Sequence, residues 1–324
     1  MLKNWQEIKQ EYPKVDLLLG NGFSLNFSDK FHYDKLFEEF LKSSSNSSLY
    51  RKFRTSNFEL IMSELQTALK VNDYFKIDSN NIQSSVNELK DGLLKAIAEN
   101  HPQGYDIDEL KISSIIDEMK LFSNIFTLNY DLLLYRILMR LVEQTDEGKN
   151  SFWGDHFEYY DGSHLIFKNG RNDILNSVFY LHGSLFIFRK DYSVFKIKKG
   201  NHNYSIIEDI KNNIKNGFMP VIITEGTHGN KLKAIKSNYY LNHCYTKLID
   251  SKNPILIYGT SLSEQDKHII EALNKQDKKI IFSIHKGNKS KEEITKKQSE
   301  VKSKFGDDKV DFVYAESVFN FDKN

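Results

Sequence analysis

The chain has 324 residues, of which 40% are hydrophobic and 13% aromatic, and this supports one large or two modest globular domains. Its 45 Lys and Arg residues almost balance its 44 Asp and Glu residues, and the net charge of +1 excludes a global field that would gather nucleic acid or an anionic membrane. A single cysteine, Cys244, excludes an intrachain disulfide and a multi-cysteine zinc site. Together with the lack of a long apolar segment, these features predict a cytoplasmic protein that binds neither membrane nor nucleic acid directly.

Six short apolar runs, most of them ending in turn or cap residues, predict the strands of one sheet. In chain order they are Val15–Leu19, Asn124–Thr127, Ser177–Leu181, Ile255–Tyr258, Lys279–Ile284 and Val310–Tyr314. Helical apolar spacing follows the second run in YDLLLYRILMRLVEQ and the fourth in SEQDKHIIEALNK. Strands that alternate with helices predict a Rossmann-like α/β fold, with a mostly parallel sheet flanked by helices and ligands beyond the carboxyl ends of its strands.

Two regions interrupt this alternation, and we expect both to be additions to a single domain spanning residues 1–324. The first, about residues 33–119, predicts a helical insertion, and the second, about residues 150–252, predicts a small irregular or β-containing lobe. The Rossmann-like core of the domain is then expected to consist of residues from about 1–32, 120–148, 177–190 and 253–324. In the basic stretch 275–304, the segment KSKEEITKKQSEVKSKFG interleaves lysines with glutamates at helical spacing, which indicates a solvated helix face.

The first predicted strand ends in a glycine turn, Gly20-Asn21-Gly22-Phe23-Ser24. Such glycine pairs close many strands in proteins that bind nothing. Alternatively, the missing side chains would let backbone N–H groups approach a pyrophosphate. The turn is not the GxGxxG dinucleotide fingerprint, because no third glycine follows at the required offset.

Three polar residues, Thr127, Asn129 and Asp131, follow at alternate positions where the second strand ends. Either Asn129 or Asp131 would serve as the N-cap of the next helix, but capping does not require all three. Residues two apart in an extended segment point the same way. We therefore expect all three side chains to face one cavity at the carboxyl edge of the sheet.

The third and fourth strands end in His182-Gly183 and Gly259-Thr260-Ser261. A histidine at such a position is either a hydrogen-bonded structural residue or a functional one. Small and hydroxyl residues at a strand end can bind phosphate or ribose oxygens. Each of these signals is modest by itself.

In this order the four motifs resemble those of the sirtuin family, namely Gly-Ala-Gly-x-Ser, Thr-Gln-Asn-x-Asp, a His-Gly pair with the catalytic histidine, and Gly-Thr-Ser-Leu. The matching segments are Gly20–Ser24, Thr127–Asp131, His182–Leu185 and Gly259–Leu262. The resemblance covers the Rossmann-like core, about half of the chain. One cysteine cannot build the four-cysteine zinc module of sirtuin deacylases, so the pattern is more similar to zinc-less bacterial sirtuin-like NADases of antiphage defence.

This resemblance implies an NAD+ glycohydrolase that cleaves NAD+ to nicotinamide and ADP-ribose without a metal, as a regulated effector that depletes NAD+ in antiphage defence. It also implies a homo-oligomer and a regulatory partner such as a HerA-like ATPase. A non-catalytic module that senses NAD or ADP-ribose is the alternative. A protein deacylase or ADP-ribosyltransferase comes third, since the zinc cysteines are missing.

The resemblance also assigns roles to individual residues. Asn129 would bind the ribose hydroxyls or position water, Asp131 would hold the nicotinamide carboxamide, and His182 would act as general base. The residues expected to contact NAD+ are Gly20, Asn21, Gly22, Phe23, Ser24, Thr127, Gly183, Gly259, Thr260 and Ser261. His285 would reach the adenine end or lie in a plain surface loop, and Glu225 would either shape the pocket or cap a helix.

Overall fold

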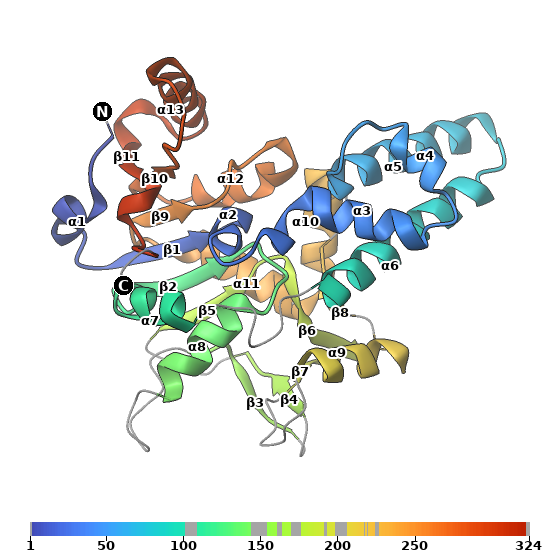
Figure 1. The fold of residues 1–324 in the computed structure, drawn as a ribbon, viewed down its shortest axis with the longest axis horizontal. Helices are drawn as coiled ribbons and strands as arrows, with labels where there is room; N and C mark the ends of the chain where they lie inside the picture. The colour runs from blue at the N-terminus through green and yellow to red at the C-terminus, as the bar shows by residue number, and fades with distance from the viewer. Residues whose placement is uncertain are drawn as a thin grey trace.

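The computed structural model describes residues 2–100, 109–143, 154–160, 164–169, 176–190, 193–197, 206–216, 218, 220–223 and 227–321. It confirms the predicted fold class, with a six-stranded parallel sheet flanked by helices and a smaller antiparallel sheet (Figure 1). None of the helices in these ranges has the length and apolar character needed to cross a bilayer.

The parallel sheet forms from the six apolar runs that the sequence marks. Its strands are β1 (Val15–Leu19), β2 (Phe122–Thr127), β5 (Ser177–Tyr180), β9 (Ile255–Tyr258), β10 (Ile280–Ile284) and β11 (Val310–Tyr314). The order is β11-β10-β9-β1-β2-β5, and every neighbouring pair is parallel. All residues of β1, β5, β9 and β10 are buried, as expected for strands covered on both faces. The strand order reverses between β1 and β9, and such a switch point opens a crevice at the carboxyl edge.

Helices along the chain cover this sheet. They are α1 (Trp5–Ile8), α2 (Asn21–Leu25), α7 (Glu109–Met119), α8 (Leu133–Glu143), α11 (Tyr239–Asp250), α12 (Lys267–Leu273) and α13 (Lys291–Phe305). Helix α7 packs on α8, α11 packs on β5 and α12, and α13 packs on β10 and β11. The segment with interleaved lysines and glutamates forms α13 as predicted, mostly exposed and anchored by buried Val301 and Phe305.

The helical insertion projects from one side of the sheet (Figure 1). It consists of α3 (Tyr33–Ser43), α4 (Ser47–Arg51), α5 (Phe58–Phe75) and α6 (Asn80–Asn100). Helix α6 packs on both α3 and α5. The ring of Phe40 lies against Gly92, where a Cβ atom would come within 2.2 Å of it, so this helix contact requires glycine. Helix α7, also within the predicted insertion, packs instead beside the parallel sheet on α8.

The second sheet lies next to the first and is antiparallel. Its strands are β3 (Phe157–Tyr159), β4 (His164–Phe167), β6 (Gly183–Lys190), β7 (Ser193–Ile197) and β8 (Pro220–Ile222), in the order β3-β4-β7-β6-β8. Helix α9 (Ile206–Lys215) packs on β6 and β7, and α10 (His228–Ser237) packs on α11 and α12. Strand β6 follows β5 after two residues, so the turn at His182 joins the two sheets.

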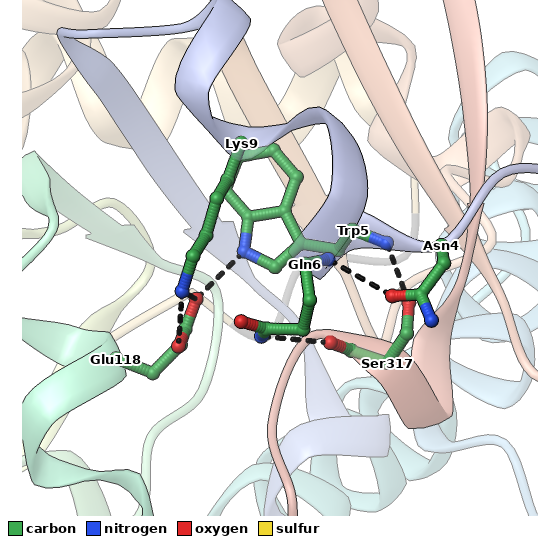
Figure 2. Close-up of polar contacts among 6 residues, drawn as sticks. All are labelled: Asn4, Trp5, Gln6, Lys9, Glu118 and Ser317. Carbon is green, nitrogen blue, oxygen red and sulfur yellow. Dashed lines mark hydrogen bonds and ion pairs between the residues drawn. The ribbon is translucent and has the colours of Figure 1, made fainter.

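The N-terminal helix ties together segments that are far apart in the sequence (Figure 2). Trp5 is fully buried, and its indole N–H donates to Glu118 at 2.8 Å, the carboxylate that also pairs with Lys9 at 3.3 Å. The backbone N–H of Trp5 donates to the Ser317 hydroxyl at 2.9 Å, and the Gln6 side chain donates to the Ser317 carbonyl. Helix α1 therefore fastens the end of α7 to the C-terminal segment.

Candidate functional site

A cavity of about 420 Å³ lies at the carboxyl edge of the parallel sheet, where the strand order reverses. Its sheet side is formed by Gly20, Asn21, Leu128, Asn129, Tyr130, Asp131, His182, Gly259, Thr260, Ser261, Ser263, Gln265 and Asp266. Its other wall comes from residues 31–93, namely Phe31, Leu36, Asn57, Leu60 and Leu93. The ends of four strands thus meet the helical insertion around one space.

Asn129, Ser24 and Asp131 form a hydrogen-bonded chain at this edge. The Asn129 Nδ2 group donates to the Gly20 carbonyl at 3.1 Å and to the Ser24 hydroxyl at 3.0 Å. The Ser24 hydroxyl then donates to Asp131 Oδ2 at 2.7 Å. Both Asn129 amide hydrogens are used, so its Oδ1 is the group left for a ligand. An amide flipped by 180° would set Oδ1 against the Gly20 carbonyl oxygen, which excludes that orientation.

Asp131 combines a capping contact with a place in the cavity wall. Its Oδ1 accepts the backbone N–H of Leu133 at 2.8 Å, at the start of α8. Burial raises the pKa of the Asp131 carboxyl, and the hydrogen bonds from Ser24 and Leu133 oppose this shift. The capping interpretation and the cavity interpretation of Asp131 therefore both describe the structure.

Thr127 differs from the expectation that it faces the cavity. It is 1% exposed, it is not among the cavity-lining residues, and its hydroxyl accepts the backbone N–H of Asn129 at 3.1 Å. Strand β2 ends at Thr127, so the chain beyond it no longer alternates as the prediction assumed. Ser24 is likewise buried behind the wall, and Phe23 packs among Phe27, Tyr258, Phe319 and Phe321.

The glycines of the first turn pack directly against the turn after β9. A Cβ atom at Gly22 would lie 2.8 Å from Gly259 Cα, and one at Gly20 would lie 2.5 Å from Thr260 Cβ. The Gly22 N–H donates to the Gly259 carbonyl at 2.7 Å. Gly259 itself has φ of +73°, which favours glycine. Contact between the two turns accounts for these glycines, and the Gly22 N–H is already used in it. The expected approach of backbone N–H groups of this turn to a pyrophosphate stays a prediction.

His182 lies in the cavity wall, 2% exposed, with its Nε2 3.0 Å from Nε2 of His268 on α12. Burial, followed by the charge of Lys231 and the neighbouring His268, holds the pKa of His182 well below its usual value. Gly183 does not line the cavity. It has φ of +79°, and its missing Cβ makes room for the Val221 carbonyl, which would otherwise lie at 1.8 Å.

A second cavity, of about 840 Å³, lies on the other side of the same two turns. Gly259, Thr260 and Ser261 line both cavities, while Gly22 lines only the second. His285 lies in the wall of the second cavity, and its Nδ1 is 2.8 Å from Glu316. Charged residues of both signs complete this wall, namely Lys289, Lys296, Lys297, Glu293 and Glu300.

Several residues of the site were not predicted. The apolar wall from the insertion and the partners of His182 depend on how distant segments pack, and no local motif marks them. Lys231 is fully buried and pairs with Asp266 at 3.2 Å, next to the two histidines. Glu225 lies outside the described residues.

The remaining reactive residue types do not form a second centre in the described ranges. Cys244 is fully buried, and burial raises the pKa of its thiol to about 12, so it is not an activated nucleophile. Among the described residues no three His, Cys, Asp or Glu side chains are grouped as metal ligands.

Comparison with protein families gives a match over nearly the whole chain. The model of the family described as "Domain of unknown function (DUF4917)" matches residues 17–320. The match contains all four strand-end motifs, the insertion and the antiparallel sheet. The comparison with curated proteins gave no match.

Proposed function

Because the chain belongs to the DUF4917 family, whose description assigns no activity, we propose a function from the site itself, that of an NAD+ glycohydrolase. The observation that supports it is that Asn129 and Asp131, which follow β2, and His182, which follows β5, line one cavity at the switch point of the sheet. The resemblance of the four motifs to the sirtuin family supports the same substrate. The reaction would convert NAD+ and water to ADP-ribose, nicotinamide and a proton.

The polar groups that the cavity offers suit the ribose next to nicotinamide. Asn129 has only its Oδ1 acceptor free, and Asp131 contributes carboxylate oxygens. His182 has Nε2 engaged by His268, which leaves Nδ1 for a ligand. Acceptors placed together in this way fit the hydroxyl groups of a ribose and the positive charge that develops on its C1′ atom.

Departure of nicotinamide needs no general acid from the protein. The nicotinamide nitrogen is positively charged in NAD+, so cleavage of the bond to C1′ returns an electron pair to it and releases a neutral molecule. Asp131, buried in the wall, would stabilise the oxocarbenium-like ribose. Water would attack C1′, and His182 would accept its proton directly or through the ribose 3′-hydroxyl. Leu36, Leu60 and Leu93 would shield this step from bulk solvent.

A binding module that senses NAD or ADP-ribose without turnover is the second candidate. It is favoured by the internal hydrogen bonds of Asn129 and Ser24, which leave the polar wall satisfied without a ligand. If the protein is an enzyme, we propose that it is a regulated effector that depletes NAD+ in antiphage defence. The resemblance supports an oligomer and an ATPase partner that keep the hydrolysis inactive until it is triggered.

The test is incubation of the purified protein with NAD+, with and without candidate activators, followed by quantification of nicotinamide and ADP-ribose. The variants are Asn129→Ala and His182→Ala, each compared by thermal unfolding with the wild type. His243→Leu is the matched control, because His243 is also a buried histidine but lies away from both cavities. We expect both site variants to lose at least about 100-fold in rate and the control to retain it.

Three outcomes separate the candidates. Equal amounts of nicotinamide and ADP-ribose, lost in both site variants, support the hydrolase. Turnover that survives both substitutions contradicts the site. Binding of NAD+ without turnover under every activating condition supports the sensor, and transfer of ADP-ribose or removal of acyl groups on an added protein supports the third alternative.

A further inference from the structure

Behind the first cavity two buried histidines are hydrogen-bonded to each other. Nε2 of His182, in the turn after β5, lies 3.0 Å from Nε2 of His268, in the first turn of α12. Their ring planes are inclined by 25°, and the two residues are 2% and 0% exposed. Two neutral imidazoles that meet in this way share one proton, so one Nε2 must donate and the other must accept. The tautomers of the two rings are therefore coupled.

Burial, together with positive charge next to the pair, keeps both rings neutral. Lys231, on α10, is fully buried and forms an ion pair with Asp266 at 3.2 Å. Burial first, and then Lys231 and His228, lower the pKa of His268 to about 3. The pKa of His182 is lowered in the same direction by burial, Lys231 and His268. At neutral pH each imidazole ring therefore carries one N–H proton. The hydrogen bond between the two rings determines which ring nitrogen carries that proton.

The surroundings of His268 favour one of the two arrangements. Its Nδ1 is buried and has no hydrogen-bond partner, so no donor among the described residues requires this nitrogen to accept. The backbone of Gln265 raises the pKa of the ring, which is the direction that a nearby acceptor for a ring N–H gives. With Nε2 of His268 facing His182, the nitrogen that can carry this proton is Nδ1. His268 then presents an unprotonated Nε2 to His182.

We propose that His268 is a positioning residue that accepts the Nε2–H of His182 and so leaves His182 Nδ1 unprotonated toward the cavity. The inference rests on the proposed function, in which this Nδ1 accepts a proton. During hydrolysis the water oxygen bonds to C1′, the C1′–N bond breaks with its electron pair going to nicotinamide, and the water proton goes to His182 Nδ1. The resulting imidazolium is held by the same hydrogen bond to His268, and it loses its proton to solvent after the product leaves.

The first experiment measures the tautomers in the free protein and does not depend on turnover. Protein labelled with ¹⁵N-histidine is analysed by long-range ¹H–¹⁵N correlation, and the His182 signals are assigned by their loss in His182→Gln. We expect His182 with its proton on Nε2 and His268 with its proton on Nδ1. The opposite arrangement, or a His182 tautomer that is unchanged in His268→Leu, overturns the proposal.

The second experiment measures kcat, KM and the pH profile of NAD+ hydrolysis. His268→Leu should lower kcat by about 10- to 100-fold with little change in KM. His268→Gln should recover part of it, because its amide oxygen can accept the Nε2–H. The control His243→Leu should match the wild type, and thermal unfolding of all variants tests the fold. Equal kcat values in His268→Leu and His268→Gln overturn the positioning role. Predicted tautomers in a protein without hydrolysis would refute only the proposed function.

Discussion

Substitution of Gly22 by alanine tests whether the glycine turn is primarily a packing device. The added Cβ atom would lie 2.8 Å from Gly259 Cα, 3.0 Å from its oxygen and 3.2 Å from its carbonyl carbon. All three are backbone atoms, so the two turns would have to separate, and the 2.7 Å hydrogen bond from Gly22 to Gly259 would lengthen. Overpacking costs about 1–3 kcal/mol and a weakened hydrogen bond about 1 kcal/mol, so the free energy of unfolding should fall by about 2–4 kcal/mol.

Urea unfolding followed by circular dichroism measures this loss. Gly229→Ala is the matched control, because a Cβ atom at Gly229 in α10 would meet no heavy atom within 4 Å. The control should be as stable as the wild type or up to about 1 kcal/mol more stable, since alanine favours helix. A Gly22→Ala variant within about 0.5 kcal/mol of wild type would refute the packing account. Loss of nucleotide binding at unchanged stability would instead support a glycine reserved for a phosphate.

Two further predictions concern the buried histidine pair and the cavity wall. Lowering the pH from 7.5 to 5.5 should destabilise the wild type by about 1.4 kcal/mol more than His268→Leu, because the folded pKa of His268 is about 3 against 6.5 when unfolded. The unfolded chain therefore binds the extra proton, so this stability is present above pH 6.5 and is lost as the pH falls below it. Urea unfolding of both proteins at both pH values measures the effect, and equal losses of unfolding free energy in wild type and His268→Leu would contradict it. Leu60→Trp should raise the KM for NAD+ about tenfold, because the larger side chain narrows the cavity. Val71 is exposed on the same helix outside the cavity, so Val71→Trp should leave KM unchanged. Equal KM values in the two variants would contradict a role of the insertion in binding NAD+.

The fold could be predicted because its signals are local. Apolar runs covered on both faces match β1 and β9 to the residue, and the turn residues after them mark where each strand ends. For the insertion and the antiparallel sheet, the sequence predicted the type of secondary structure but not the packing of the helices or the order of the strands. Helix α7 shows why, since its amphipathic pattern is the same whether it packs on other insertion helices or on α8 beside the sheet.

The site was predicted only in the part that the strand ends supply. Asn129, Asp131 and His182 meet because parallel strands bring their carboxyl ends to one edge. The prediction for Thr127 was wrong in orientation, because β2 ends at that residue and side-chain alternation ends with it. His268 gave no signal, since a histidine in the first turn of a helix has many possible neighbours and only the packing of α12 selects His182.

Helix α13 shows how the same sequence pattern can conceal a contribution to the site. Its charges indicate a solvated face, yet Lys297 donates to the Ser261 carbonyl at 3.3 Å and Lys304 to the Leu262 carbonyl at 2.7 Å. Leu262 has φ of +47° and is fully buried, a conformation that costs a non-glycine residue about 1–3 kcal/mol. The two lysines hydrogen-bond the carbonyl of Leu262 and that of the residue before it. The turn that lines both cavities is thus held by two hydrogen bonds from α13 that need no ligand.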